Sequence, residues 1–485
     1  MEKQILLGNN LDVLKTFPDN YFDSIVTDPP YGLGKEPNPE EVLRGWLDNG
    51  HHEIKGGGFM NAHWDAHTPG PAIWKEALRV LKPGGYVLSF FGTRTYDWGV
   101  MAMRLAGFEI KDSLTWAYGS GFPKSHNVSR AIDEKLGFER PTEIKSVGDI
   151  NNARYAGKET SPRVLKEVTI NEPQSELAKK WNGFGTALKP ATEPIVLARK
   201  PLEKGLTIAE NVMKWGTGAL NIDGCRIETD DSLNGGAYSG GERGDGEWKD
   251  NSGFKNDKLE EFTQPDGRWP ANLILSHHID CTNAQCHEDC PAGILDKQSG
   301  TLKSGAIKST YIAKESENNH MSGKNYEHAM MDRNPSTASR FFYCAKASKR
   351  EKNRGCENIM PKKLDHAREH GQAGTDNAFN RGATVKTNSH PTVKPLGIIR
   401  HLTKLITPPQ GTCLDLFAGS GTTGIACELE GFGYVLIDME PDYVEITKAR
   451  IAAWRLNPEL EEPEEDETEK DQTTPKEKSP QLGLF

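Results

Sequence analysis

The sequence predicts an α/β protein built on a twisted, mostly parallel sheet with helices on both faces. Two stretches, residues 1–120 and 386–456, carry that prediction because each alternates short apolar strands with helices. The stretch between them is polar and rich in glycine, with only short apolar islands. At 485 residues, the chain is long enough for two or three domains and a sizeable core.

The first stretch is expected to alternate strands with helices. Its strands are short runs of β-branched and apolar residues between polar flanks, whereas its helices repeat apolar residues every three or four positions. A proline or glycine lies just beyond each helix and ends it. The expected strands cover 5–8, 23–27, 86–91 and 109–118, with a further strand at 193–199, and the expected helices cover 11–17, 73–81 and 98–106.

The last stretch contains a strand that leads into a glycine turn and then a helix, at 411–423. Gly419 and Gly421 let the backbone approach a ligand closely, and the following helix N-terminus offers free N–H groups. A second strand, 434–437, ends in Asp438 roughly 20 residues beyond the turn, where a carboxylate can accept both hydroxyls of a ribose. The sequence has neither the lysine of a phosphate loop nor the glycine spacing of the dinucleotide fingerprint. The expected ligand is therefore a nucleoside without a pyrophosphate, such as S-adenosylmethionine.

The tetrapeptide Asp28-Pro29-Pro30-Tyr31 follows the strand expected at 23–27. Two consecutive prolines fix φ and end that strand in a rigid, extended turn. A carboxylate, a proline carbonyl and an aromatic ring are thereby displayed at the carboxyl end of a strand, where ligands bind in open α/β sheets. The two acceptors suit an exocyclic amine, and the ring suits stacking on a flat heterocycle. Taken alone, an Asp-Pro pair is also typical of an ordinary turn.

Three motifs in this order resemble the amino-methyltransferases of DNA, which methylate adenine N6 or cytosine N4. They are Asp-Pro-Pro-Tyr at 28–31, His-Pro-Thr-Val-Lys-Pro at 390–395 and Phe-Ala-Gly-Ser-Gly at 417–421. Their order resembles the permuted, beta-group arrangement of the family, and the segment 189–199 resembles phage and prophage members. The resemblance implies a Rossmann-like S-adenosylmethionine-dependent methyltransferase fold with circularly permuted motifs and an inserted recognition region.

In the target site, the resemblance implies that Asp28 and the carbonyl of Pro29 accept hydrogen bonds from the amine, while Tyr31 stacks on the base. An exocyclic amine is a poor nucleophile because its lone pair is delocalised into the ring. Two acceptors favour a pyramidal nitrogen whose lone pair points at the sulfonium methyl, so positioning and charge stabilisation do most of the work. No metal is expected in this chemistry. The base must leave the duplex to reach such a site.

In the cofactor site, the resemblance implies that Asp438 holds the ribose and that Lys394 and Thr392 lie near the methionine end. Asn9 occupies a position where the family usually has an acidic residue near the adenine of the cofactor. The full set of expected cofactor-binding residues is Asn9, Thr392, Lys394, Asp415, Phe417, Gly419, Gly421 and Asp438.

These motifs divide the chain into four parts. Residues 1–200 are expected to form the catalytic half of the core, 201–385 a target-recognition insertion, 386–456 the cofactor-binding half, and 457–485 a disordered acidic tail. Scattered basic and aromatic residues suit the insertion to contact with DNA. A merely structural insertion is the alternative.

One group of residues in the insertion resembles a metal site: His277 and His278 with Cys281, Cys286 and Cys290. Zinc ligands usually come in tighter pairs, and a Cys-x4-Cys-x3-Cys spacing is a loose fit. Free, partly buried thiols are therefore the favoured interpretation, and no metal site is assigned. Eight cysteines without regular short spacing indicate reduced thiols in a cytoplasm rather than a disulfide framework.

The net charge of -10 is concentrated in the tail. Residues 457–480 hold ten acidic and three basic residues, a local charge of -7, which leaves -3 for the rest of the chain. The near-neutral body is compatible with a basic groove for DNA without demonstrating one. The chain ends in Gln481-Leu482-Gly483-Leu484-Phe485, which resembles the bacterial sliding-clamp binding motif. A chance hydrophobic terminus is the alternative.

The sequence thus favours a cytoplasmic bacterial, phage or prophage enzyme that methylates adenine N6 in double-stranded DNA. Aspartate at the first position of the tetrapeptide favours adenine, because the cytosine-N4 members of the family more often carry serine there. The alternatives are a cytosine-N4 DNA methyltransferase, a methyltransferase of RNA or protein amides, and a catalytically silent, clamp-tethered DNA-binding protein. No membrane partner is expected, because the sequence shows neither a hydrophobic run of transmembrane length nor a signal-peptide pattern.

Overall fold

A computed structural model of the protein describes both of the predicted α/β stretches. The described residues are 2–34, 36–52, 65, 68–119, 121, 125–147, 164–229, 266–278, 281, 285–288, 290–300, 337–345, 349–360, 362–363 and 385–458. The polar stretch 232–258 and the tail from 459 onward lie outside them, so the expectations for the recognition insertion and the terminal peptide stay predictions in those parts.

A nine-stranded sheet forms the centre of the described structure. Its strands are β1 (Lys3–Leu7), β2 (Phe22–Thr27), β3 (Leu81–Phe90), β4 (Glu109–Ala117), β7 (Thr192–Arg199), β8 (Leu273–Ser276), β9 (Tyr343–Ala345), β12 (Thr412–Asp415) and β13 (Gly433–Asp438). They lie in the order β1-β13-β12-β2-β3-β7-β4-β8-β9. Neighbours are parallel except that β7 runs antiparallel to both β3 and β4. The predicted mostly parallel α/β sheet is confirmed.

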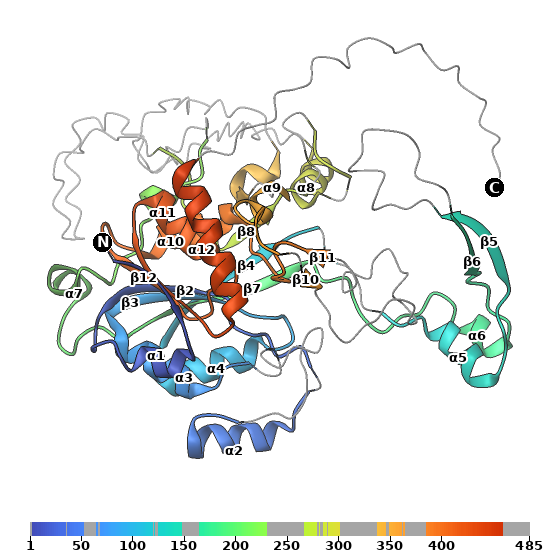
Figure 1. The fold of residues 1–485 in the computed structure, drawn as a ribbon, viewed down its shortest axis with the longest axis horizontal. Coiled ribbons are helices and arrows are strands. Elements are labelled where there is room, and N and C mark those ends of the chain that lie inside the picture. The colour runs from blue at the N-terminus through green and yellow to red at the C-terminus, as the bar shows by residue number, and fades with distance from the viewer. Residues whose placement is uncertain are drawn as a thin grey trace, which may run out of the picture.

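Two layers of helices cover the sheet, one on each face (Figure 1). One layer contains α1 (Asn10–Leu14), α3 (Pro71–Val80) and α4 (Tyr96–Ala106), with α2 (Pro39–Asn49) beyond it, and the other contains α10 (Leu396–Ile406), α11 (Thr422–Glu430) and α12 (Pro441–Leu456). Along β2, Ile25 packs into the core of the first layer and Val26 into that of the second. Burial on both faces explains why these two consecutive residues of β2 are both apolar. None of the described helices combines the length and apolar character needed to cross a membrane.

The Lys-Pro-Gly-Gly run at 82–85, which follows the helix expected at 73–81 and precedes the strand expected at 86–91, lies inside β3. The helix α3 passes directly into this strand, because Leu81 already pairs with Phe22 of β2. The next pairing joins Ser24 to Tyr86, so the intervening residues of β3 form a bulge. Gly84 supplies the left-handed backbone that the bulge needs, with φ of 79°.

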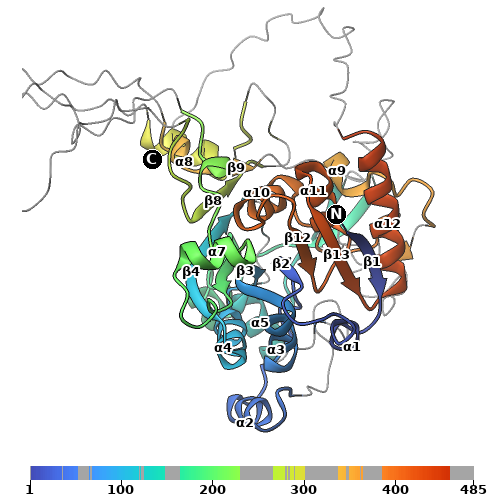
Figure 2. The same cartoon turned by 90° about the vertical axis from the view of Figure 1, so that its left-hand side faces the viewer.

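The chain between the two α/β stretches contributes to the core and also leaves it. The strands β8 and β9, from the expected recognition insertion, extend the sheet at the end opposite β1, with α8 (Pro291–Ser299) beside them (Figure 2). Between β4 and β7, the chain makes an excursion away from the sheet that the sequence did not predict (Figure 1). It consists of α5 (Val128–Leu136), β5 (Thr142–Val147), β6 (Val164–Thr169) and α6 (Glu176–Lys180).

Several short elements complete the described structure. They are α7 (Ile208–Trp215), α9 (Lys349–Asn353), the 3-10 turns Asp223–Cys225 and Ala338–Phe341, and the pair β10 (Lys362–Lys363) and β11 (Val385–Lys386). A capping box begins α7, in which the side chains of Thr207 and Glu210 each accept a hydrogen bond from the other residue's backbone.

Candidate active site

The sheet brings the tetrapeptide and the glycine turn together at one edge. Leu7 of β1 lies opposite Asp438 of β13, and Leu414 of β12 lies opposite Ile25 of β2, so the carboxyl ends of these parallel strands form one row. A hydrogen bond of 2.7 Å from the Thr27 hydroxyl to Asp415 joins β2 to β12 across 388 positions of sequence. The predicted two halves of the site are therefore adjacent in space.

Asp28 is held by a lysine that the sequence placed near the cofactor. The ammonium of Lys394 lies 2.5 Å from Asp28 Oδ2, and its side chain is only 9% exposed. The other carboxylate oxygen, Oδ1, is buried and has no hydrogen-bond partner among the described residues. Pro29 is buried and Pro30 half-buried beside it, which keeps the carboxylate in place. Asp28 thus presents one fixed oxygen and one that lacks a donor.

A second carboxylate completes this cluster. Glu193 Oε2, on β7, lies 3.5 Å from the Lys394 ammonium and accepts a hydrogen bond of 2.8 Å from the Tyr31 hydroxyl. Burial opposes the charge of Lys394, but Asp28 and Glu193 outweigh it and raise the pKa of this lysine. Burial and the same two carboxylates raise the pKa of Tyr31 well above its usual value. Two carboxylates against one ammonium leave this buried cluster with a net charge of about -1.

The backbone after the two prolines is fixed by side chains from three segments. Asp65 Oδ1 accepts hydrogen bonds from the Tyr31 and Gly32 N–H groups, at 2.8 and 3.0 Å. The hydroxyls of Thr95 and Thr68 donate to the Tyr31 carbonyl, at 2.6 and 3.2 Å. The aromatic ring expected to stack on the target base is therefore held in one position.

The glycine turn after β12 needs glycine for two physical reasons. Gly419 and Gly421 have φ of 53° and 75°, in the left-handed region. A Cβ on Gly419 would lie 2.6 Å from His390 Nε2, and one on Gly421 would lie 2.5 Å from Thr447 Cγ2. Each glycine therefore allows both the backbone conformation and the close approach of a neighbouring element.

Two side chains of α12 hold the glycine turn from behind. The Thr447 hydroxyl donates to the Gly419 carbonyl at 3.0 Å, and the Arg450 guanidinium donates to the Ser420 carbonyl at 2.5 Å. Arg450 is fully buried, and this burial lowers its pKa to about 10. It also donates to the Glu351 carbonyl at 3.2 Å, which links α9 to the turn.

Asp438 lies at the end of β13, directly beside the turn. Its Oδ2 accepts a hydrogen bond of 2.7 Å from the Gly419 N–H, and its Oδ1 accepts one of 2.9 Å from the Glu440 N–H. Burial raises the pKa of Asp438 to about 6, although these backbone donors oppose the shift. The carboxylate that was expected to hold the ribose is thus positioned by the turn itself.

Asp415 has three hydrogen bonds to the protein. Its Oδ1 accepts from the Thr27 hydroxyl and from the Phe417 N–H at 3.1 Å, and its Oδ2 accepts from the Thr423 hydroxyl at 2.7 Å. Burial raises its pKa to about 6. In the structure, this residue joins β2, β12 and α11; its expected contact with the cofactor stays a prediction.

The other expected cofactor residues lie around the same edge. The Asn9 side chain caps α1 by accepting a hydrogen bond of 3.0 Å from Leu11 N, directly after β1. Thr392 is exposed, and its N–H donates to His390 Nδ1 at 3.4 Å. Phe417 is half-buried at the start of the turn. Their expected contacts with the cofactor stay predictions.

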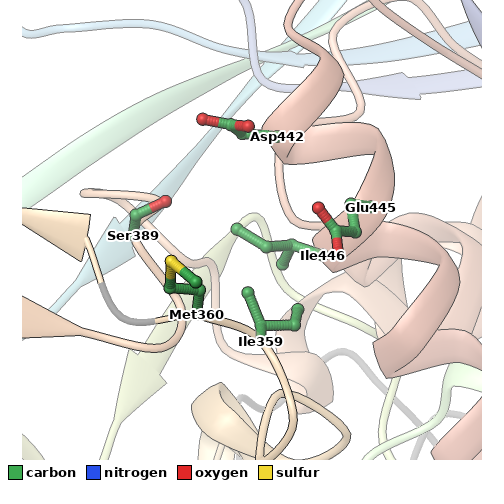
Figure 3. A pocket seen from close by; sticks show the side chains of 6 residues that line it. All are labelled: Ile359, Met360, Ser389, Asp442, Glu445 and Ile446. Atoms are coloured by element: carbon green, nitrogen blue, oxygen red, sulfur yellow. The ribbon is translucent and has the colours of Figure 1, made fainter.

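A small pocket of about 200 Å³ lies behind this region, between α12 and the segments before β10 and α10 (Figure 3). Asp442, Glu445 and Ile446 line it from α12, and Ile359, Met360 and Ser389 line it from the other side. Ligand pockets for drug-sized molecules usually hold about 300–1,000 Å³. None of the expected site residues lines this pocket, so it is separate from the edge described above.

Comparison with known proteins identifies the family. A family model described as DNA methylase, of the N6/N4 type, matches residues 22–449. The chain belongs to the N6/N4 DNA methylase family. The match includes the tetrapeptide, the glycine turn and the strands β2, β12 and β13, whose carboxyl ends bring the two motifs together.

Two curated relatives resemble parts of the chain. The methylase is 28% identical over 143 residues to the type II methyltransferase M.HpaI of Haemophilus parainfluenzae, which covers 29% of this chain and 40% of that protein. It is 25% identical over 226 residues to M.HindIII of Haemophilus influenzae, which covers 43% of this chain and 61% of that protein. The chain therefore spans about two to three fifths of the length of these relatives.

Two solved structures align along most of the methylase. The cytosine-N4-specific PvuII DNA methyltransferase has a TM-score of 0.36 at 12% identity, with 93% of this chain and 86% of that chain covered. The complex of M1.HpyAVI with SAM has a TM-score of 0.32 at 13% identity, with 92% and 98% covered.

Sequence reasoning missed Glu193 and Asp65 as members of the site. Glu193 lies within the segment 189–199, which carried the resemblance to phage members, so its position gave a usable signal. Asp65 stands between residues of a glycine- and histidine-rich stretch, where one carboxylate has no distinguishing pattern. Only the folded backbone shows that it binds the turn after Pro30.

Proposed function

We propose that this protein transfers a methyl group from S-adenosylmethionine to an exocyclic amine of a base in double-stranded DNA. The observation that carries the proposal is the state of Asp28: Lys394 holds Oδ2, while the buried Oδ1 has no partner among the described residues. A buried acceptor without a donor costs free energy, which an amine N–H from a ligand would recover. Membership of the DNA methylase family supports a base in DNA as that ligand.

The charge of the cluster suits this reaction. As the amine attacks the methyl group, positive charge develops on the nitrogen, and a fixed environment of net charge about -1 stabilises it. Asp28 lies where it can accept the surplus proton after transfer, directly or through water. Tyr31 and its fixed backbone supply the flat surface for a flipped base.

The residues of the glycine turn fit the cofactor. S-adenosylmethionine supplies the electrophilic methyl group. Asp438 offers a carboxylate for the ribose hydroxyls, and the two left-handed glycines let the backbone lie against the ligand. The hydroxyl of Thr447 and the guanidinium of Arg450 keep that backbone in position.

Methyl transfer to duplex DNA tests the proposal directly. Purified full-length protein is incubated with labelled S-adenosylmethionine and duplex DNA, and the digested nucleosides are identified by mass spectrometry. Asp28→Asn should lower the rate about 100- to 1,000-fold, as is typical when a stabilising group of the transition state is removed. Asp23→Asn, at the other end of β2, is the matched control. Equal activity of Asp28→Asn and wild type, or no label in the DNA, would refute the proposal.

Adenine N6 is the target atom we favour, as expected from aspartate at the first position of the tetrapeptide. The same digestion distinguishes the two bases, because N6-methyladenine and N4-methylcytosine are separate products. N4-methylcytosine as the only product would assign the alternative. The resemblance of 189–199 to phage and prophage members supports a bacterial or phage-infected cytoplasm as the place where the enzyme acts, and detection of the methylated DNA there tests this location.

We further infer that the terminal peptide, Gln481–Phe485, binds a sliding clamp. Its glutamine, paired leucines and terminal aromatic residue resemble the clamp-binding motif. Deleting these five residues should abolish capture by immobilised clamp and leave methylation of short duplexes unchanged. Deleting Asp471–Pro475 shortens the tail equally and should leave capture intact. Capture that survives loss of the terminal peptide would refute this inference.

A further inference from the structure

One imidazole and three thiols lie together at the end of the sheet formed by β8 and β9. They belong to His277, Cys281, Cys286 and Cys290, and one ligand atom from each lies within 4.8 Å of every other. His277 directly follows β8, and Cys290 is the N-cap of α8. The three cysteines are free thiols. The sequence had grouped His277 with His278, and its cysteine spacing did not predict this convergence.

The distances match those of a tetrahedral metal site. His277 Nδ1 lies 3.5 Å from Cys286 Sγ and 3.4 Å from Cys290 Sγ. Zinc binds sulfur at about 2.3 Å and imidazole nitrogen at about 2.0–2.1 Å, so tetrahedral angles place nitrogen and sulfur about 3.5 Å apart. The two distances from His277 Nδ1 therefore already have the nitrogen–sulfur length of such a site, and the remaining ligand pairs lie within 4.8 Å.

The backbone around the sulfur atoms is arranged as it is around metal-bound thiolates. The His287 N–H points at Cys281 Sγ at 3.2 Å, and the Gly293 N–H points at Cys290 Sγ at 3.4 Å. Such donors offset the negative charge of thiolate ligands and fix their direction. A Cβ at Gly293 would lie only 2.7 Å from the Cys286 Cβ, so glycine allows this loop to reach the helix.

We propose that His277, Cys281, Cys286 and Cys290 bind a structural zinc ion. Three thiolates and one imidazole are soft ligands that select zinc over magnesium or calcium. Four protein ligands close the coordination sphere, which is the arrangement of structural rather than catalytic zinc sites. The proposal replaces the earlier interpretation of these cysteines as ordinary free thiols, and it does not depend on the proposed methyltransferase activity.

The local packing shows why a metal would be useful here. The hydrophobic cluster at this end has only Leu275, Cys290 and Ala292 as fully buried members among the described residues. A core this small gives little stability, and a structural metal is a common substitute. Asp296 of α8 accepts hydrogen bonds of 2.8 Å from the Ser339 N–H and hydroxyl, so fixing α8 also fixes the segment that enters β9.

The site would also fix a segment on the reactive side of the molecule. The strand β8 runs parallel to β4, and β4 and β3 are both antiparallel to β7. The carboxyl end of β8 therefore points to the same edge of the sheet as the end of β2. A zinc ion bound at His277 would therefore connect this end of β8 to Cys290 at the start of α8.

Metal content and cobalt spectroscopy test the proposal without an activity assay. Full-length protein purified without chelators should contain about one zinc per chain by mass spectrometry, the value for one closed site. Cys286→Ala should lose this zinc, whereas Cys286→His, which keeps a ligand, should retain it. Cys344→Ala is the control: this half-buried thiol lies on β9, and its sulfur donates to the carbonyls of Ser339 and Phe342.

A second measurement decides the matter if a variant does not fold. Cobalt(II) added to metal-free wild-type protein should give the visible absorption of a tetrahedral, thiolate-ligated ion, and zinc should abolish it. Wild-type protein with less than about a tenth of an equivalent of zinc and no such absorption would overturn the proposal. Zinc that is retained equally by Cys286→Ala and Cys344→Ala would overturn it as well.

Discussion

Replacing Lys394 by methionine tests whether its positive charge keeps the neighbouring carboxylates Asp28 and Glu193 ionised. The ammonium lies 2.5 Å from Asp28 Oδ2 and 3.5 Å from Glu193 Oε2. At an effective dielectric constant of about 20, charges at these separations attract by about 7 and 5 kcal/mol. Desolvation of the three groups cancels part of this attraction. Breaking a buried ion pair typically costs about 3–5 kcal/mol, which we take as the net effect.

The cost of breaking this ion pair should change how the rate of methyl transfer depends on pH. One pH unit corresponds to about 1.4 kcal/mol, so about 3–5 kcal/mol moves the acid limb of the rate profile upward by about 2–4 units. The Lys394→Met variant should therefore hold an extra proton near neutral pH, because two adjacent carboxylates without a cation favour the protonated form. We expect kcat/KM at pH 7 to fall by up to about tenfold and to recover in large part at pH 9.

Steady-state methyl transfer from pH 5 to 9, together with the Kd for S-adenosylmethionine, measures this effect. Lys82→Met is the matched control, because its ammonium lies 2.6 Å from Asp23 at the opposite end of β2. That variant should lose stability without moving the acid limb. An unmoved acid limb in Lys394→Met would refute the reasoning. If only the Kd for the cofactor increased, Lys394 would act at the methionine end, as the family resemblance implied.

Three further predictions concern the residues around Lys394 and the glycine turn. Glu193→Gln keeps a partner for the Tyr31 hydroxyl but removes one negative charge. The kcat should therefore fall about 10- to 100-fold, with little change in KM for DNA. An unchanged kcat would contradict the proposal that the negative charge of the cluster stabilises the transition state. Gly421→Ala should lower the free energy of unfolding by about 1–3 kcal/mol and weaken cofactor binding. Gly431→Ala is the control, because Gly431 has the same φ of 75° and a Cβ there would have no atom within 4 Å. This variant should lose only the stability that a left-handed backbone costs a residue with a Cβ. The pKa of Asp438 is about 6, so its carboxylate is ionised above that pH and protonated below it. Titration calorimetry should therefore show the Kd for S-adenosylmethionine rising by up to about tenfold per pH unit below pH 6. Asp438→Asn should remove this pH dependence.

The parts of the site that could be predicted from sequence are those fixed by local chemistry. Two consecutive prolines end β2 whatever residues follow them, and the left-handed turn after β12 requires Gly419 and Gly421. The pairing of Asp28 with Lys394 joins residues 366 positions apart, and no local pattern specifies it. Family resemblance assigned that lysine a different neighbour, so only the folded sheet shows the contact.

Contacts between distant parts of the chain also explain what the sequence left unpredicted outside the site. The strands β5 and β6 pair through polar, alternating sequences at 142–147 and 164–169, which lack the apolar runs that mark the central strands. For the cysteine cluster, the sequence grouped His277 and His278 with Cys281, Cys286 and Cys290, but the loose Cys-x4-Cys-x3-Cys spacing favoured free thiols. The four ligand atoms of His277 and the cysteines come together because β8 ends beside α8, which the spacing does not specify.

Asp415 shows how the permuted order of motifs can work. Asp415 links the two halves of the site through the protein itself. It accepts a hydrogen bond from Thr27, the last residue before Asp28, and another from Thr423 in the helix that follows the glycine turn. Those bonds cross from one strand to its neighbour, so they depend on β2 and β12 being adjacent in the sheet and not on which comes first in the chain. Any rearrangement of the chain that keeps β2 beside β12 would keep the distance between Asp28 and the glycine turn. Burial keeps the pKa of Asp415 at about 6, and a charged carboxylate is tolerated there because its donors come from both halves of the site at once.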